Sequence, residues 1–325
     1  MSPKKSESLH IVTPLLESKE LSRLAGRRVW LKMENMQPGG SFKIRGIGHT
    51  MQEAVSKLGV TRFIGSSGGN AGMAMAVAAQ KMNVPLTIYI PTSTKPFMID
   101  NLKNYCADVV VTGENWNQAN EAAKEALKQE GTFLVHPYDQ PDTWEGHSTL
   151  VQELQNQLPQ APGCIVSCVG GGGLVLGLLQ GLEKAGWSST PVLAMETEGA
   201  HCFAAARQAG QVVQLAGITS VATSLGALSV SETLFNLSVE KPERILNHVV
   251  SDTKAKAASV KFADNMRVLV EASCGAALSG VYSGVINHLD IPQGDIVVVV
   301  CGGNIINLEI INTWRQEMSN LTQNS

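Results

Sequence analysis

The sequence predicts an α/β protein built on open, twisted and mostly parallel sheets. Short apolar runs rich in β-branched residues alternate with segments of helical periodicity, which is the pattern of parallel strands joined by helices. Some runs are apolar throughout, as in IVVVV at residues 296–300, which is typical of strands covered on both faces. Of the 325 residues, 44% are hydrophobic and 16% are charged, so the chain can fill a large core.

The alternation can be followed along the chain from strand to helix. In the first half, strands are predicted at RVWLKM (28–33), RFIGSS (62–67), PLTIYIP (85–91) and DVVVTG (108–113). Helical patterns follow these strands at about 42–58, 69–82, 95–105 and 115–129. In the second half, CIVSCVG (164–170), a helix over 174–186, PVLAMET (191–197) and DIVVVVCGG (295–303) continue the pattern, and a closing helix follows. Connections between parallel strands should be right-handed.

The chain is expected to form two lobes. The segment PYDQPDTW (137–144), with its two prolines, is the most linker-like break in the middle. We therefore expect residues 1–37 and 141–325 to form a large domain and residues 38–140 a small one. A ligand would then bind in the cleft between them.

Charge and cysteine spacing exclude several classes of protein. A net charge of −3 offers no basic surface, so we expect no nucleic-acid partner. Residues 1–15 lack the apolar run of a signal peptide, and no stretch approaches the roughly 20 apolar residues of a membrane span. A soluble, cytoplasmic protein is therefore expected. The sequence contains no CxxC pair, so neither a disulfide framework nor a zinc ribbon is indicated. Reduced thiols are expected at Cys106, Cys164, Cys168, Cys202, Cys274 and Cys301.

The segment VGGGGL (169–174) lies between an apolar strand and a helix. Backbone N–H groups at such a turn, together with the positive end of the helix, bind anions such as phosphate. A turn that needs only positive φ explains one or two glycines but poorly explains four. The fingerprint GxGxxG does not fit, because Val175 or Leu176 stands where its last glycine belongs, and there is no GxxxxGK[ST]. The loop predicts a different phosphorylated ligand.

Two further segments each allow two interpretations. In SSGGNAG (66–72), the amides of residues 67–71 and the Ser67 hydroxyl could hold a small carboxylate, with Asn70 donating to a neighbouring oxygen. A Ser/Asn helix cap explains the same residues. In GGSFKIRG (39–46), Lys43 is either a surface lysine on an amphipathic helix or a desolvated lysine of lowered pKa that forms a Schiff base.

The motifs together resemble those of a known family. GGSFKIRG, SSGGNAG, VGGGGL, METEGAH and VVVVCGGN, in this order, are similar to the pyridoxal-phosphate enzymes of fold type II, whose fold is like that of the tryptophan synthase β subunit. MENMQPGGSFKIRG and WEGH narrow the resemblance to the animal L-serine/L-threonine dehydratases, toward the shorter serine dehydratase-like variant. The resemblance implies elimination of water from L-serine or L-threonine, giving pyruvate or 2-oxobutanoate plus ammonia. It also implies a cytoplasmic homodimer in amino-acid catabolism and gluconeogenesis.

The resemblance implies a role for each motif, with Lys43, Ser67 and Gly68 as catalytic residues. Lys43 would carry pyridoxal 5′-phosphate as a Schiff base and then accept the α-proton, with Phe42 against the ring. Asn70 would bind the ring hydroxyl, Cys301 would face the ring nitrogen, and Ser224 would lie on the opposite ring face. The phosphate would be bound by Gly170, Gly171, Gly172, Gly173 and Leu174, and the substrate carboxylate by Ser67, Gly68, Gly69, Asn70 and Ala71. A monovalent cation such as potassium would be held by Gly170, Glu196, Ala200, Cys202, Leu225 and Ala227.

Three residues bear on the implied chemistry. A neutral thiol at Cys301 cannot keep a proton on the ring nitrogen, which favours elimination over transamination. Cys202 would be a poorer ligand for a hard cation than an oxygen. Gly68 stands where liver-type dehydratases have alanine and serine racemases have serine, so two-base racemisation is disfavoured and Gly68→Ala is expected to raise activity toward serine. The alternatives are a low-activity or inactive cofactor-binding homologue, a serine racemase and a cysteine synthase-like enzyme.

Overall fold

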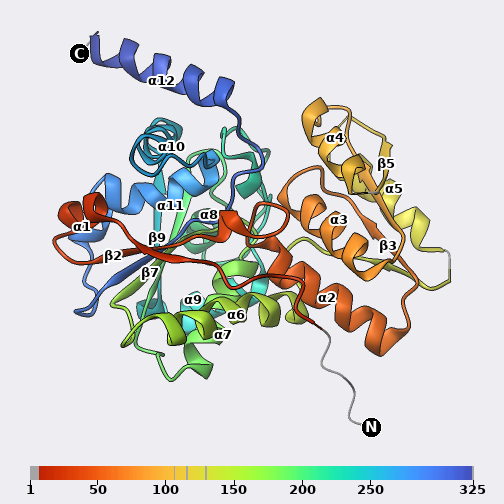
Figure 1. Cartoon of the computed structure of the whole chain (residues 1–325), viewed down its shortest axis with the longest axis horizontal. Coiled ribbons are helices and arrows are strands. Elements are labelled where there is room, and N and C mark those ends of the chain that lie inside the picture. The colour runs from red at the N-terminus through yellow and green to blue at the C-terminus, as the bar shows by residue number, and fades with distance from the viewer. Residues whose placement is uncertain (1–6, 106, 115, 129, 324–325) are drawn as a thin grey trace. The chain divides into compact units, whose positions relative to one another are not determined.

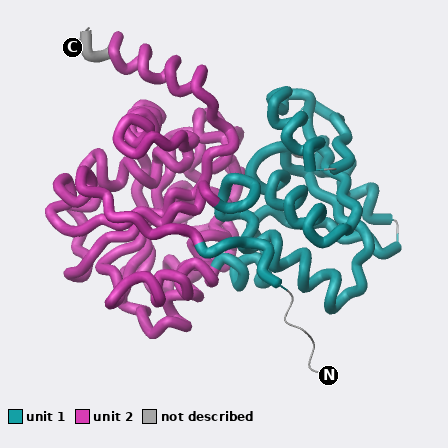
Figure 2. Tube along the Cα trace, in the orientation of Figure 1, with its two compact units in different colours: residues 1–12, 37–147 teal, residues 13–36, 148–325 magenta. Residues whose placement is uncertain are grey.

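The structure is a computed structural model that describes residues 7–105, 107–114, 116–128 and 130–323. Contacts divide the chain into two compact units (Figure 2). Unit 1 comprises residues 1–12 and 37–147, and unit 2 comprises residues 13–36 and 148–325. Residues 7–12 group with unit 1 because Leu9 is buried in the core of that unit. The range expected from sequence placed these residues in the large domain instead. The backbone of Ile11 also exchanges two hydrogen bonds with the Gln37 side chain.

Unit 1, whose strands β3 and β5 are labelled in Figure 1, is built on a four-stranded parallel sheet in the order β5-β4-β3-β6. Its strands are β3 (Arg62–Gly65), β4 (Leu86–Ile90), β5 (Asp108–Val111) and β6 (Thr132–Leu134). Its helices are α2 (Lys43–Leu58), α3 (Asn70–Met82), α4 (Pro96–Asn104) and α5 (Trp116–Glu125). A helix follows each strand, as the alternating pattern predicts.

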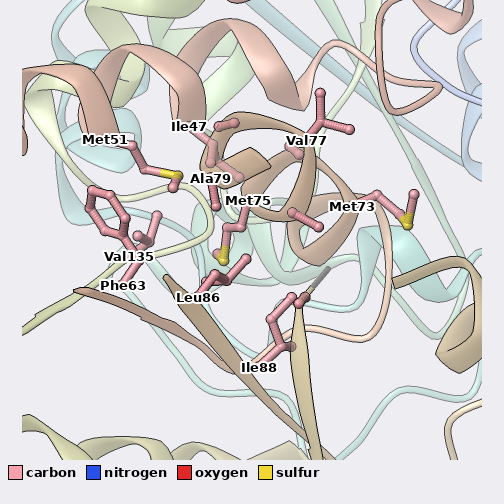
Figure 3. Packing of buried hydrophobic residues seen from close by; sticks show 14 of the residues in the cluster. Ile47, Met51, Phe63, Met73, Met75, Val77, Ala79, Leu86, Ile88 and Val135 are labelled. Atoms are coloured by element: carbon pink, nitrogen blue, oxygen red, sulfur yellow. The ribbon is translucent and has the colours of Figure 1, made fainter. Parts of the chain in front are cut away.

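The core of unit 1 is formed by α2, α3 and the apolar side chains of the sheet (Figure 3). Met51 of α2 and Met75 of α3 are fully buried in the same cluster as Phe63 of β3. Met75 packs where a side chain on Gly65 would stand, since a Cβ there would lie 2.4 Å from Met75 Sδ. Every residue from 70 to 79 is buried, so the first turn of α3 is held firmly in place.

Unit 2 is built on a six-stranded sheet in the order β1-β2-β10-β7-β8-β9. Its strands are β1 (Leu15–Glu17), β2 (Val29–Lys32), β7 (Cys164–Cys168), β8 (Val192–Thr197), β9 (Ile245–Val250) and β10 (Ile296–Val299). Only the β1–β2 pairing is antiparallel among these described strands. All residues of β7, β8 and β10 are buried, as expected for apolar strands of a parallel sheet. The predicted fold class is confirmed.

Seven α-helices lie wholly within the described part of unit 2. They are α1 (Lys19–Ala25), α7 (Gly173–Lys184), α8 (Cys202–Ala209), α9 (Glu232–Glu240), α10 (Asp252–Met266), α11 (Ala272–Tyr282) and α12 (Leu308–Gln323). The fully buried part of α11 packs on β7, β8 and β10, and α10 packs between α11 and α12. Within the described residues, no helix has the length and apolar character needed to cross a membrane.

One sequence prediction about the middle of the chain is wrong. Residues 141–144, expected in a linker, form the first turn of α6 (Pro141–Gln157). Proline is favoured in the first turn of a helix because its missing N–H would have no partner there, so Pro141 marks a helix start. The boundary between the units falls inside α6, between His147 and Ser148.

Candidate active site

Lys43 is the first residue of α2, directly after a tight glycine turn. Gly39 and Gly40 have φ values of 81° and 72°, which side-chain-bearing residues rarely adopt. The Lys43 Nζ donates a hydrogen bond of 2.6 Å to the Pro137 carbonyl oxygen. The same nitrogen lies 5.4 Å from the centroid of the Phe42 ring. The half-buried amine is thus held between a carbonyl and an aromatic ring at the start of a helix.

His147, the histidine of the WEGH segment, is a buried neighbour of Lys43 and Phe42. Its ring centroid lies 5.0 Å from that of Phe42, with the ring planes tilted by 56°. The contact with α2 requires Gly46, because a Cβ there would lie 2.5 Å from His147 Cε1. Among the described residues, neither ring nitrogen has a hydrogen-bond partner. Burial, and then the charges of Lys43 and Arg45, hold the pKa of His147 well below its usual value, so the ring is neutral.

The SSGGNAG segment forms the predicted turn between β3 and α3. Asn70 is the first residue of α3 and is buried, and Gly69 precedes the helix without a side-chain cap among the described residues. The Ser67 carbonyl packs against the first helical turn, where a Cβ on Gly72 would lie 1.8 Å from its oxygen. The Ser67 hydroxyl accepts a hydrogen bond of 3.3 Å from the Gly69 amide. Uncapped N–H groups at a helix start are suited to an anion such as a carboxylate.

The VGGGGL segment forms the corresponding turn between β7 and α7 in unit 2. Gly172 precedes α7 with φ 103°, and no side chain of the described residues caps this helix. A Cβ on Gly172 would lie 2.8 Å from Leu234 Cδ2, and one on Gly170 would lie 2.9 Å from the Leu225 carbonyl oxygen. The glycines therefore let the backbone turn in a confined space, leaving the first amides of α7 for an anion.

Three thiols lie close together in unit 2. Cys168 ends β7 and its Sγ donates a hydrogen bond of 3.5 Å to the Sγ of Cys301, which follows β10. Hydrogen bonds with Cys168 and with Cys274, together with burial, raise the pKa of Cys301 well above its usual value. Cys301 is thus a neutral thiol. The described cysteines are all free, as predicted, while Cys106 lies outside the described residues.

Ser224 belongs to a buried polar cluster whose other members were missed from the sequence. It lies in a short 3-10 helix, Thr223–Leu225, where its hydroxyl donates to the Glu271 carboxylate and contacts the Ser273 hydroxyl. The other carboxylate oxygen of Glu271 accepts from the Ile305 amide at 3.3 Å. A glutamate directly before a helix, as in VEASCG, was the signal available, but its partner lies 47 residues away.

Glu196, predicted as a cation ligand, is the next-to-last residue of β8 and accepts hydrogen bonds from backbone and side-chain amides. Its carboxylate oxygens accept from the Phe203 and Ala204 amides at the start of α8 and from Asn247 Nδ2, each at 2.9 Å. Burial raises the pKa of Glu196 to about 7, against the lowering effect of these hydrogen bonds. The described residues contain no group of three His, Cys, Asp or Glu side chains arranged for a metal ion.

Part of the predicted cation set nevertheless lies together. The Cys202 Sγ donates to the Gly170 carbonyl oxygen at 3.4 Å, and the Leu225 backbone packs against Gly170. The Ala227 amide donates to the Leu225 carbonyl oxygen at 2.7 Å. Burial raises the pKa of Cys202 to about 12, so this side chain is a neutral thiol and a weak ligand for a hard cation.

A lysine that starts one helix and a glycine loop that starts another, on parallel α/β sheets, are typical of proteins that bind phosphorylated small molecules. The model of the pyridoxal-phosphate dependent enzyme family matches residues 7–302, and the chain belongs to this family.

Relatives match over nearly the whole length. A human protein named serine dehydratase-like is 48% identical, with 93% of each chain covered. Human L-serine dehydratase/L-threonine deaminase is 46% identical, with 96% of each chain covered. The crystal structure of a fungal L-serine ammonia-lyase from Rhizomucor miehei matches with a TM-score of 0.89 at 37% identity, covering 96% of this chain and 99% of that one. The predicted family resemblance is confirmed.

The residues present fit pyridoxal phosphate. The confined turn at Gly170 and Gly172 leaves backbone amides for a phosphate, and Lys43 offers an amine beside an aromatic ring. A neutral thiol at Cys301 is compatible with an uncharged pyridine nitrogen. The amine, the backbone amides and the neutral thiol are the kinds of group that pyridoxal phosphate requires around it.

Proposed function

We propose that the protein is a pyridoxal-phosphate-dependent dehydratase that converts L-serine to pyruvate and ammonia, and L-threonine to 2-oxobutanoate and ammonia. The observation that carries the proposal is the Lys43 amine, held beside the Phe42 ring at the start of α2. Similarity over 93% or more of the length to human proteins named as dehydratases supports the same reaction.

Lys43 is the residue to which we assign both cofactor attachment and proton transfer. Bound pyridoxal phosphate would withdraw electrons from the substrate Cα and so make its proton acidic. The free Lys43 amine would accept that proton as a general base. The Pro137 carbonyl oxygen lies within hydrogen-bond distance of this amine and would hold the resulting ammonium. Phe42 would bound the ring on one side.

The glycine loop and the thiols of unit 2 would provide fixed, uncharged surroundings. Backbone amides of residues 170–174 would bind the phosphate at the start of α7. Cys301 would face the ring nitrogen, and its raised pKa means that it neither carries charge nor gives up a proton near neutral pH. Such a partner leaves the ring nitrogen uncharged, which favours elimination. Ser224 would lie on the ring face opposite Phe42.

The loop before α3 would bind the substrate. Amides of Ser67, Gly68, Gly69 and Ala71 would take up the carboxylate, and Asn70 would donate to the ring hydroxyl. Gly68 has no side chain that could deliver a proton to the second face of Cα, so we assign dehydration rather than racemisation as the main reaction.

The proposal extends to potassium, a homodimer and a cytoplasmic location. The Glu196 oxygens already accept three N–H bonds, so the ion would depend mainly on carbonyl oxygens of Gly170, Ala200, Leu225 and Ala227. The 2-oxo acid products would place the enzyme in amino-acid catabolism, with pyruvate available for gluconeogenesis.

Steady-state assays of the cofactor-loaded protein test the proposal. L-serine and L-threonine should yield 2-oxo acids, D-serine should yield none, and exchange of potassium for sodium should change the rate. Lys43→Ala should lose the visible absorption band of the lysine Schiff base and at least about 10³-fold in activity. Lys57→Ala, at the far end of α2 in an exposed pair with Glu53, should keep both. A band without 2-oxo acid from either substrate would favour an inactive homologue, and racemised serine would favour a racemase.

A further inference from the structure

The side chain of Thr94 lies where a side chain on Gly68, in the loop proposed to bind the carboxylate, would stand. A Cβ on residue 68 would lie 2.7 Å from Thr94 Cγ2 and 3.0 Å from Thr94 Oγ1. Ile90 Cγ2, at 3.3 Å, closes a further side of the same space. Both branches of Thr94 therefore face the volume that a side chain at position 68 would occupy.

Thr94 has little freedom to move away from this space. Its amide donates to the Pro91 carbonyl at 3.0 Å, which closes a turn at the end of β4. The turn is joined to the segment after β5, because the Thr92 amide donates to the Gly113 carbonyl at 2.9 Å. Threonine is β-branched, so its side chain is stiff at χ1. Rotation about χ1 would turn only one of the two branches away from Gly68 and put a hydrogen in its place. The support for Gly68 is thus built into a fixed turn.

Among the described residues, hydrogen bonds and packing hold the loop on either side of Gly68. The Ser66 hydroxyl donates to Asn120 Oδ1 at 2.8 Å. On the other side, the first turn of α3 is buried and packs on the Ser67 carbonyl through Gly72. Glycine has the largest backbone freedom of any residue, so Gly68 needs an outside contact to keep its amide in one orientation.

We propose that Thr94 is a positioning residue for the carboxylate loop, its two branches taking the place of the side chain that Gly68 lacks. The inference rests on the proposed function, because that function gives the loop its ligand. Residues 68 and 94 would then form a complementary pair. The combined side-chain volume at these two positions would keep the amides of the carboxylate loop in place. The gain in activity expected for Gly68→Ala on sequence grounds would then require a smaller residue at position 94.

Exchange of volume between the two positions tests the pair. Thr94→Ala should raise KM for L-serine about tenfold and leave kcat within about twofold, since it loosens ground-state binding. Gly68→Ala should lower kcat/KM about tenfold, because it crowds Thr94 and displaces the loop. Gly68→Ala/Thr94→Ala should return KM to within about twofold of wild type. Gly68→Ala/Thr94→Val keeps both branches and should be as impaired as Gly68→Ala.

Thermal unfolding of the cofactor-loaded variants without substrate provides a readout independent of the reaction. Gly68→Ala and Gly68→Ala/Thr94→Val should both lower the midpoint, and Gly68→Ala/Thr94→Ala should recover it. Thr92→Ala, exposed in the same turn, should leave KM and the midpoint unchanged. If the substitutions at positions 68 and 94 changed the unfolding midpoint additively, the proposed coupling of the two residues would be wrong. If the midpoints were coupled but the protein had no dehydratase activity, only the proposed function would be rejected. If Thr94→Ala were active with an unchanged KM for L-serine, Thr94 would not be a positioning residue.

Discussion

The two units hold their functional residues in different ways. In unit 1 two of the candidate residues offer side chains from the first turns of helices, because Lys43 begins α2 and Asn70 begins α3. In unit 2 the glycine loop before α7 offers backbone amides, and Cys301 offers a neutral thiol. In the proposed function, the group that moves a proton is therefore a side chain, whereas the group that binds phosphate is backbone, which does not titrate.

Burial acts on titratable groups in both units, but on groups of opposite kind. In unit 1 it lowers the pKa of His147, and in unit 2 it raises the pKa of Glu196 to about 7. In each case the neutral form is favoured, because charge is costly away from water. Since one group is a base and the other an acid, the stability that each contributes should depend on pH in opposite directions.

Among the tests that compare the two units, the largest effect is expected when the glycine loop of unit 2 is changed by Gly172→Ala. The substitution puts a Cβ on a residue with φ 103° and within 2.8 Å of Leu234 Cδ2, so the turn before α7 must change. We expect affinity for pyridoxal phosphate to fall about 100-fold, the equivalent of one or two hydrogen bonds to a charged group. Absorbance titration of the cofactor-free protein measures this.

The matched control is Gly186→Ala, which follows the other end of α7. Gly186 has φ 71° and no heavy atom within 4 Å of its would-be Cβ among the described residues, so it carries a similar backbone cost without the clash. Equal cofactor affinity of the two variants would contradict the assignment of the phosphate to the glycine loop.

The next effect concerns the pH dependence of Glu196. A carboxyl with a raised folded-state pKa contributes stability that is fully present below its unfolded pKa of about 4.5 and is lost as pH rises through about 7. Relative to Glu196→Gln, the wild-type free energy of unfolding should therefore fall by about 3 kcal/mol across this window. Urea unfolding at several pH values measures the difference. A bound cation would lower the carboxyl pKa, so potassium in place of tetramethylammonium should move the window to lower pH.

His147 should show the opposite sign. Because burial depresses its folded-state pKa, His147 contributes stability that is present above its unfolded pKa of about 6.5 and is lost as pH falls. Relative to His147→Gln, the wild-type protein should lose about 1.4 kcal/mol per pH unit below pH 6.5, until the depressed pKa is reached. Urea unfolding from pH 7 downward checks this, and parallel curves for the two proteins would contradict a neutral, buried imidazole.

Local motifs were predictable from sequence, and contacts between distant segments were not. The helix start at Lys43 and the turns at Gly68 and Gly172 each depend on consecutive residues, so their patterns could be read directly. Strands such as β1 and β6, of three residues each, are too short to show a period. The contact of Thr94 with Gly68, and that of Glu271 with Ser224, join segments whose proximity only the fold creates.

The smallest effect is expected for Ser224→Ala. Ser224 and Glu271 form a hydroxyl–carboxylate pair in unit 2. The Ser224 hydroxyl donates to Glu271, so it could in principle transfer a proton. If unit 2 only surrounds the reaction, kcat for L-serine should change by no more than about threefold, because a proton-transferring group contributes about 10²–10⁴-fold. Glu271 keeps its hydrogen bond from Ile305, and Ser273→Ala is the matched control within the same cluster. A loss of about 100-fold in Ser224→Ala alone would make Ser224 a reacting group and contradict a purely surrounding role for unit 2.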